Sequence, residues 1–139
     1  RFVFISPEEL RIPQYVKDET LTPLHQNYKE TADLEAELPG LDVLYMTRIQ
    51  KERFFNEEDY LRLKGCYELD EKLLQQAPPT MPVLHPLPRI DEIKPDVDND
   101  PRAAYFDQVH NGVYIRMAII LALLGIPDPL TGKKVLESI

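Results

Sequence analysis

The sequence predicts an α/β fold of three layers, in which a parallel sheet carries helices on both faces. Short apolar runs alternate with segments of helical character, as in chains built from β–α–β units. The runs are continuous rather than alternating, which is expected of parallel strands that are covered on both faces. A length of 139 residues, 43% of them hydrophobic, suits one globular domain or one half of a two-domain unit.

The first predicted strand spans residues 2–5, and a helix start follows it directly. Ser6 is the expected N-cap, and Pro7 suits the first helical position, ahead of two acidic residues. The chain opens without a Met and already inside this strand. We therefore expect that residues upstream of Arg1 are missing from this chain.

Further short elements follow in alternation. Residues 43–46 and 81–84 are apolar runs that predict strands, and residues 31–38, 57–64 and 70–76 predict short helices. Asp70 is the expected cap of the last of these helices, which Pro78 and Pro79 bring to an end. Each strand candidate is followed by a polar or proline-containing segment, as expected of an open α/β sheet.

A long helix is predicted over residues 101–125, with Asp100 as its cap and Pro101 in its first position. Apolar residues recur along it at spacings of three or four, and beyond Arg116 it is apolar nearly all round. Such a helix needs cover on several sides, so we expect a partner domain or subunit to provide it. Residues 1–125 are interpreted as one domain and residues 126–139 as a C-terminal tail.

The composition narrows the classes of partner. A net charge of −8 argues against nucleic acid and against anionic membrane surfaces. Cys66 is the single cysteine, which excludes an intrachain disulfide and fits a reducing, cytosolic setting. The three histidines are isolated and lack metal-ligand spacing, so a metal site is not indicated. The longest apolar run, residues 117–124, is far shorter than the roughly 20 residues that span a bilayer.

The strongest candidate site follows the strand predicted at 43–46. Arg48 can offer a fork of donors to a carboxylate, and Gln50 can add a neutral donor and acceptor beside it. Glu52 is placed to hold the Arg48 guanidinium in position. A solvated charged loop explains the same residues about equally well.

A second candidate lies in the loop after the strand predicted at 81–84. Two prolines flank Leu87, so a rigid turn can present the carbonyl oxygens of Pro86 and Leu87 to a ligand with an NH2 group. The alternative is a proline-stiffened turn with no ligand. For His85 a structural role is favoured over that of a catalytic base. Asp91 and Arg53 are candidates for an ion pair that joins the two loops.

Other chemistries find little support in the sequence. Neither common pattern of Gly-rich phosphate loop occurs, which argues against a nucleotide site of that type. A Gly-x-Ser-x-Gly element is also absent, and no motif surrounds Cys66, so a nucleophile is not indicated.

Several segments, taken in order along the chain, resemble the aspartate carbamoyltransferases. The likeness runs from residue 1 to about residue 125 and is strongest at residues 44–53, 84–93, 100–106 and 111–118. The segment His85-Pro86-Leu87-Pro88 resembles the aspartate enzymes, whereas the related ornithine enzymes carry Cys in place of the first proline. Pro86 therefore favours aspartate as the acceptor.

The resemblance implies a role for each candidate residue. Arg48 would bind a carboxylate of L-aspartate with the help of Gln50, and Pro86 and Leu87 would offer main-chain carbonyls to the carbamoyl amide and the attacking amine. Glu52 would orient Arg48. The supporting residues that would hold the closed arrangement of the domains are Arg53 and Asp91.

The resemblance also implies what this chain lacks. The family has two α/β domains and a trimeric catalytic unit, and its carbamoyl-phosphate domain carries a Ser-Thr-Arg-Thr motif that does not occur here. We expect a cytoplasmic transferase of pyrimidine biosynthesis that acts on carbamoyl phosphate and L-aspartate without a cofactor, and whose isolated second domain is inactive. Binding of regulatory subunits stays open. The alternative is a non-catalytic scaffold domain within a larger assembly.

Overall fold

The computed structural model describes residues 1–51 and 54–134. Its strands are β1 (Phe2–Ile5), β2 (Tyr28–Thr31), β3 (Leu44–Tyr45) and β4 (Val83–Leu84). Its α-helices are α1 (Gln14–Val16), α2 (Leu34–Glu37), α3 (Glu57–Leu63), α4 (Glu71–Leu74) and α5 (Tyr105–Leu123). Short turns of other helix types join them: η1 (Glu8–Leu10), η2 (Lys17–Leu21), η3 (Leu38–Gly40) and η5 (Pro95–Asn99).

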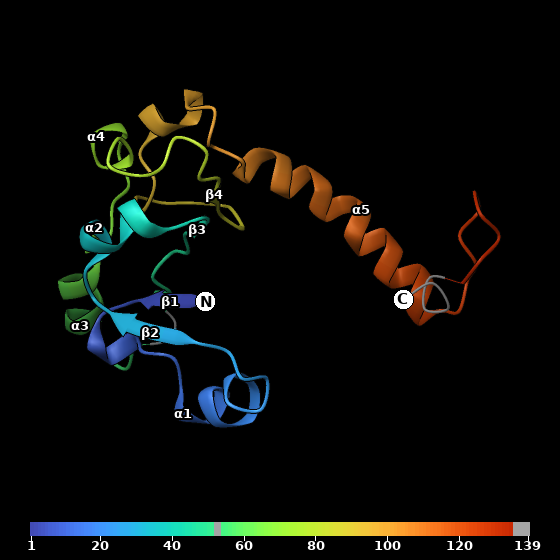
Figure 1. Cartoon of the computed structure of the whole chain (residues 1–139), viewed down its shortest axis with the longest axis horizontal. Helices are drawn as coiled ribbons and strands as arrows, with labels where there is room; N and C mark the ends of the chain where they lie inside the picture. The colour runs from blue at the N-terminus through green and yellow to red at the C-terminus, as the bar shows by residue number, and fades with distance from the viewer. Residues whose placement is uncertain (52–53, 135–139) are drawn as a thin grey trace.

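The strands pair in parallel. β1 lies beside β2 and β3 beside β4, and helical segments run between the two members of each pair (Figure 1). An isolated parallel bridge joins Leu69 to Ile93, and a second joins Val83 to Ala103. The α/β class with parallel strands is therefore confirmed.

Three helices begin where side-chain caps satisfy their first N–H groups. Asp33, Asn56 and Asp70 each accept a hydrogen bond from the backbone N–H three residues further on, at the starts of α2, α3 and α4. α3 ends shortly before Gly65, whose φ of 73° suits glycine. The helices predicted at 57–64 and 70–76 are confirmed, although α4 is shorter than expected.

Three details of the prediction are wrong. Ser6 does not cap η1, since Pro7 occupies the N-cap position and no side chain bonds there. Residues 31–38 are not one helix, because β2 extends to Thr31 and Asp33 starts α2. The long helix begins at Tyr105 rather than at residue 101. Its expected cap, Asp100, instead accepts hydrogen bonds from the backbone and guanidinium of Arg102.

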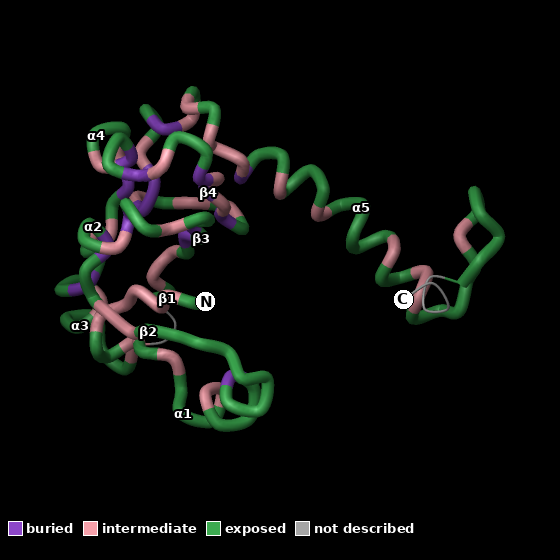
Figure 2. Tube along the Cα trace, viewed as in Figure 1, coloured by how far each residue is buried: buried purple, intermediate pink, exposed green. Residues whose placement is uncertain are grey.

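The core lies where α2, α4, β3, β4 and the start of α5 meet (Figure 2). Leu38, Leu69, Leu74, Val83 and Tyr105 are fully enclosed there. Because β3 and β4 run through this cluster, the loops that follow them start from fixed positions.

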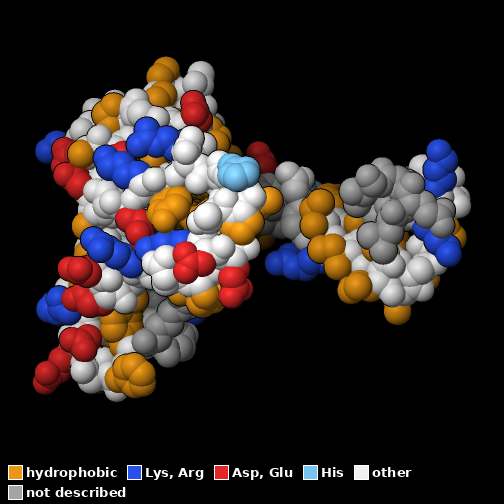
Figure 3. Space-filling model, turned by 60° about the horizontal axis from the view of Figure 1, so that its bottom comes forward, with side chains coloured by type: hydrophobic (Ala, Val, Ile, Leu, Met, Phe, Trp, Pro, Cys, Tyr) orange, Lys and Arg blue, Asp and Glu red, His pale blue; other side chains and the backbone are white. Residues whose placement is uncertain are grey.

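α5 extends away from this core as an arm (Figure 1). Of its residues only Tyr105 is buried, and hydrophobic side chains are visible along the arm in Figure 3. The apolar stripe of this helix is exposed here: Val109, Val113, Met117 and Ile120 are between 38% and 56% exposed. No helix among the described residues combines the length and apolar character needed to cross a membrane.

Candidate functional site

The two candidate loops leave neighbouring parallel strands at the same end. Tyr45 lies opposite Leu84 in the β3–β4 pair, and the Met46 N–H donates to the Leu84 carbonyl at 2.8 Å. The loop that carries Arg48 therefore starts beside the loop that carries Pro86 and Leu87. Ligands in open α/β sheets collect at this carboxyl edge.

Arg48 and Asp91 face one small cavity. Residues 47–49 form one wall of it and residues 90–92 the other, and Tyr60, Lys64, Gly65 and Tyr67 complete the lining. The two loops, more than forty positions apart in the sequence, are thus brought into one place. Arg48 is half-buried there, which limits the conformations of its guanidinium.

Arg48 and Gln50 also line a second, larger cavity of about 270 Å³. Its opposite wall is the segment that follows β1, with Ile5, Ser6, Pro7 and Leu10, and Tyr67 closes one side. The ends of β1 and β3 therefore meet at this cavity. A guanidinium and a primary amide on one wall can bind a small carboxylate, because both present N–H donors.

Pro86 and Leu87 line neither of these cavities. They form a turn in which Pro86 is exposed and Leu87 adopts a φ of 46°, a conformation that a Leu side chain seldom takes. The turn follows β4 directly. The two loops are adjacent at the sheet edge, but these two residues do not share a described cavity with Arg48.

His85 is enclosed beneath this turn, and its backbone N–H and both ring nitrogens have partners. Its backbone N–H donates to the Gln108 side chain at 2.8 Å, and both ring nitrogens lie within hydrogen-bond distance of a partner. At 1% exposure it cannot meet a substrate. The structure thus agrees with the structural role favoured for His85 over that of a catalytic base.

Arg89 lines neither of the two cavities. Its guanidinium bonds both carboxylate oxygens of Asp98 and also donates to the Tyr105 hydroxyl. This contact lowers the pKa of Asp98 and raises that of Arg89. Burial, with the Asp98 carboxylate next in importance, raises the pKa of Tyr105 to about 12. The cluster anchors the 85–92 loop to η5 and α5.

Glu52 and Arg53 lie outside the described residues. The expected support of Arg48 by Glu52 and the expected ion pair between Arg53 and Asp91 therefore stay predictions.

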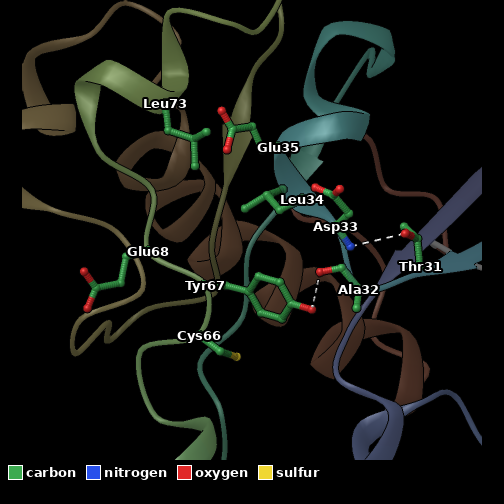
Figure 4. A pocket seen from close by; sticks show the side chains of 9 residues that line it. All are labelled: Thr31, Ala32, Asp33, Leu34, Glu35, Cys66, Tyr67, Glu68 and Leu73. Carbon is green, nitrogen blue, oxygen red and sulfur yellow. Dashed lines mark hydrogen bonds between the residues drawn. The ribbon is translucent and has the colours of Figure 1, made fainter.

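A hollow larger than these two cavities lies elsewhere, between the β2–α2 connection and residues 66–73 (Figure 4). Its lining includes Asp33, Glu35 and Glu68 but neither Lys nor Arg, so it disfavours an anionic ligand. Burial raises the pKa of the Cys66 thiol beside it, which disfavours the reactive thiolate. Despite its size, this hollow is a poorer candidate site than the edge of β3 and β4.

Sequence reasoning did not assign a site role to several residues at this edge. Tyr60 and Tyr67 line the cavities, and Glu92 and Gln108 bond to His85. Glu92 lies in a loop that follows a predicted strand, and this position could have indicated a role at the site. The sequence gives no such indication for Gln108, since a polar residue in a long helix usually faces solvent. Within residues 1–51 and 54–134, no three His, Cys, Asp or Glu side chains are grouped as a metal site requires.

Comparison with known proteins decides the family. The family described as "Aspartate/ornithine carbamoyltransferase, Asp/Orn binding domain" matches residues 1–123. The chain belongs to this family. Both candidate loops of the chain lie within the matched region.

Relatives named aspartate carbamoyltransferase catalytic subunits support the assignment. The aspartate carbamoyltransferase catalytic subunit of Bifidobacterium longum subsp. infantis is 57% identical over 138 residues, which cover 99% of this chain and 42% of the relative. That of Lachnoclostridium phytofermentans is 57% identical over 126 residues, 91% of this chain and 41% of the relative. The chain thus spans less than half the length of these relatives.

Solved structures of aspartate transcarbamoylases support the same family assignment. The catalytic subunit of M. jannaschii aspartate transcarbamoylase superposes with a TM-score of 0.73 at 40% identity, over 85% of this chain and 38% of that one. Aspartate transcarbamoylase from Trypanosoma cruzi, in complex with carbamoyl phosphate and aspartate, gives a TM-score of 0.75 at 36% identity, over 85% of this chain and 39% of that one. The fold of this domain is therefore that of the carbamoyltransferases.

Proposed function

We propose that this chain is the aspartate-binding part of an aspartate carbamoyltransferase. The observation that carries the proposal is the meeting of the Arg48–Gln50 wall with the ends of β1 and β3, next to the turn that follows β4. Family membership and the complexes of the Trypanosoma cruzi relative with carbamoyl phosphate and aspartate support it. Pro86 favours aspartate over ornithine, as the resemblance implies.

In the proposed reaction the α-amino group of L-aspartate attacks the carbamoyl carbon. The new N–C bond forms as the bond from that carbon to the phosphate oxygen breaks, and the amine proton leaves with phosphate. Arg48 and Gln50 hold the aspartate, and the carbonyls of Pro86 and Leu87 accept hydrogen bonds from the carbamoyl NH2 and the attacking amine. Positioning of this kind can supply much of the rate enhancement in a reaction of two anionic substrates.

The remaining groups of the active site come, in this proposal, from a carbamoyl-phosphate domain in the same or another chain. The exposed apolar surface of α5 is consistent with such a partner. By the same resemblance we extend the proposal to a trimeric catalytic unit, a place in pyrimidine biosynthesis and a cytoplasmic location.

The direct test is a chimera in which this chain replaces the segment that it matches in the Bifidobacterium longum relative. We expect the chimera to transfer the carbamoyl group to L-aspartate and not to L-ornithine, and the chain alone to transfer none. Transfer to ornithine would contradict the choice of acceptor. A folded chimera without any transfer would favour a non-catalytic scaffold instead.

A further inference from the structure

A buried imidazole and a buried carboxylate lie under the Pro86–Leu87 turn. His85 and Glu92 are 1% and 4% exposed, and the ring Nε2 lies 2.7 Å from Glu92 Oε1. The other ring nitrogen, Nδ1, accepts a hydrogen bond from the Leu87 N–H at 2.8 Å. The reaction described above uses neither side chain directly.

The partners determine where the ring carries its proton. Glu92 accepts hydrogen bonds from the N–H groups of Ile90 and Asp91, each at 3.1 Å, through its second oxygen. Burial alone would raise the pKa of Glu92, but the backbone N–H groups of Glu92 itself, Ile90 and Asp91, together with the His85 ring, outweigh it and lower the pKa. An ionised carboxylate only accepts, so Nε2 carries the proton and Nδ1 stays free to accept from Leu87.

The hydrogen bond to Leu87 also fixes a carbonyl. The Leu87 N–H and the Pro86 C=O belong to one planar trans peptide unit, in which they point in opposite directions. A peptide whose N–H is held against the buried ring must direct its carbonyl away from the ring. His85 therefore sets the direction of the Pro86 oxygen through a single rigid plane.

Local sequence does little to hold this geometry without the ring. Leu87 has a φ of 46°, which is uncommon for a residue with a branched side chain, and Pro88 has no N–H with which to stabilise the turn. The backbone of His85 is anchored in turn, because its N–H donates to Gln108, which also donates to the Tyr45 hydroxyl at 3.2 Å. The backbone that carries the ring is thus tied to α5 and, through Gln108, to β3.

We propose that His85, held by Glu92, is a positioning residue that aims the Pro86 carbonyl at the reacting groups, the carbamoyl amide and the attacking amine. The inference rests on the proposed function, because it assigns this carbonyl to that reaction. His85 acts through the backbone and touches neither substrate. Its role is distinct from that of Arg48, which governs the binding of aspartate.

A matched pair of substitutions separates the two contacts of the ring. In His85→Asn, the amide oxygen can take the place of Nδ1 and accept from the Leu87 N–H, while the contact with Glu92 is lost. In His85→Gln, the longer amide can reach Glu92 but leaves the Leu87 N–H without its acceptor. Both variants keep a polar side chain of similar size, and thermal melting of both shows whether the fold is kept.

In the chimera, His85→Gln is expected to lower kcat about 10- to 100-fold with the KM for aspartate within about twofold of wild type, since the misplaced groups act on the reacting atoms. His85→Asn should keep kcat within about threefold of wild type by the same reasoning. Equal kcat values for the two variants would overturn the role of His85 alone. A wild-type chimera without transfer would instead overturn the proposed function, and this role with it.

If the His85→Gln protein does not fold, a measurement on the unsubstituted chain tests the hydrogen bond between His85 and Leu87 on which the proposal depends. In the 15N-labelled 139-residue chain, NMR should find the proton of the ring on Nε2 and a scalar coupling between His85 Nδ1 and the Leu87 amide nitrogen. A proton on Nδ1, or the absence of that coupling, would overturn the proposal.

Discussion

Tyr105, Asp98 and Arg89 form one network behind the 85–92 loop. The Tyr105 hydroxyl donates to Asp98, and the Arg89 guanidinium bonds to both. Tyr105 is fully enclosed, and ionising it would place a second negative charge beside the carboxylate. Its protonated form therefore contributes to the stability of the fold.

The pKa of Tyr105 has a testable consequence at high pH. Because burial and Asp98 raise the pKa to about 12, the contribution of Tyr105 to stability is complete below pH ~10 and is lost as the pH rises towards 12. The phenolate absorbance of wild type minus that of Tyr105→Phe should show one tyrosine titrating near pH 12. A difference spectrum with its midpoint near pH ~10, the value for exposed tyrosines, would show that the hydroxyl is not enclosed as described.

At the scale of single residues, the sequence was informative where chemistry and position agree. Arg48 and Gln50 follow a strand and carry donors for a carboxylate, and the structure places both on one cavity. Asp91 and Arg48 together line the smaller cavity. The ring contacts of His85 could not be predicted, because they depend on the conformation of Leu87 and on Gln108, 23 positions away.

Helix caps govern the short elements that lead to the site. The Asp70 carboxylate accepts from the Leu73 N–H at 2.7 Å and starts α4, whose Leu74 is fully buried in the core. A helix this short has little intrinsic stability, so its cap and its packing determine whether it forms.

Asp70→Ala should therefore lower the free energy of unfolding by about 0.5–2 kcal/mol, as loss of an N-cap usually does. Urea unfolding of the chain measures this change. Asp42→Ala, at an exposed position outside any helix, is the matched control and should leave the free energy nearly unchanged. Equal effects of the two substitutions would mean that α4 does not depend on its cap.

At the scale of elements, predictions held where a local signal was strong and unopposed. Asp70 and Gly65 marked helix ends correctly. β2 was missed because Tyr28, Lys29, Glu30 and Thr31 do not form an apolar run, and the strand exists through its pairing with β1. Asp100 was a plausible cap, but the Arg102 side chain competes for its carboxylate and the helix starts later.

At the scale of the whole molecule, α5 is the unusual feature. Apolar side chains such as Val113, Met117 and Ile120 are exposed along it, as they are in surfaces that bind another protein. The sequence predicted that this helix would need cover from outside the chain, because its apolar character exceeds what a short domain can bury. Its helical type was predictable, whereas its start and its direction relative to the core were not.

The chain alone should accordingly associate as its concentration rises. Sedimentation velocity should show species larger than the monomer, and the double substitution Met117→Gln with Ile120→Gln should reduce them without unfolding the core, which contains neither residue. A wild-type chain that stays monomeric at every concentration would contradict this expectation.

The most direct test of the central claim, that the Arg48 loop binds aspartate, is the kinetics of Arg48→Ala in the chimera. We predict that kcat/KM for aspartate falls by about 30-fold or more, as expected when a contact worth about 2–5 kcal/mol with a charged ligand is removed. Arg62→Ala is the control, since Arg62 is an exposed arginine that bonds to Glu9; it should leave the kinetics unchanged. An aspartate half-saturation and kcat in Arg48→Ala equal to those of wild type would contradict the account.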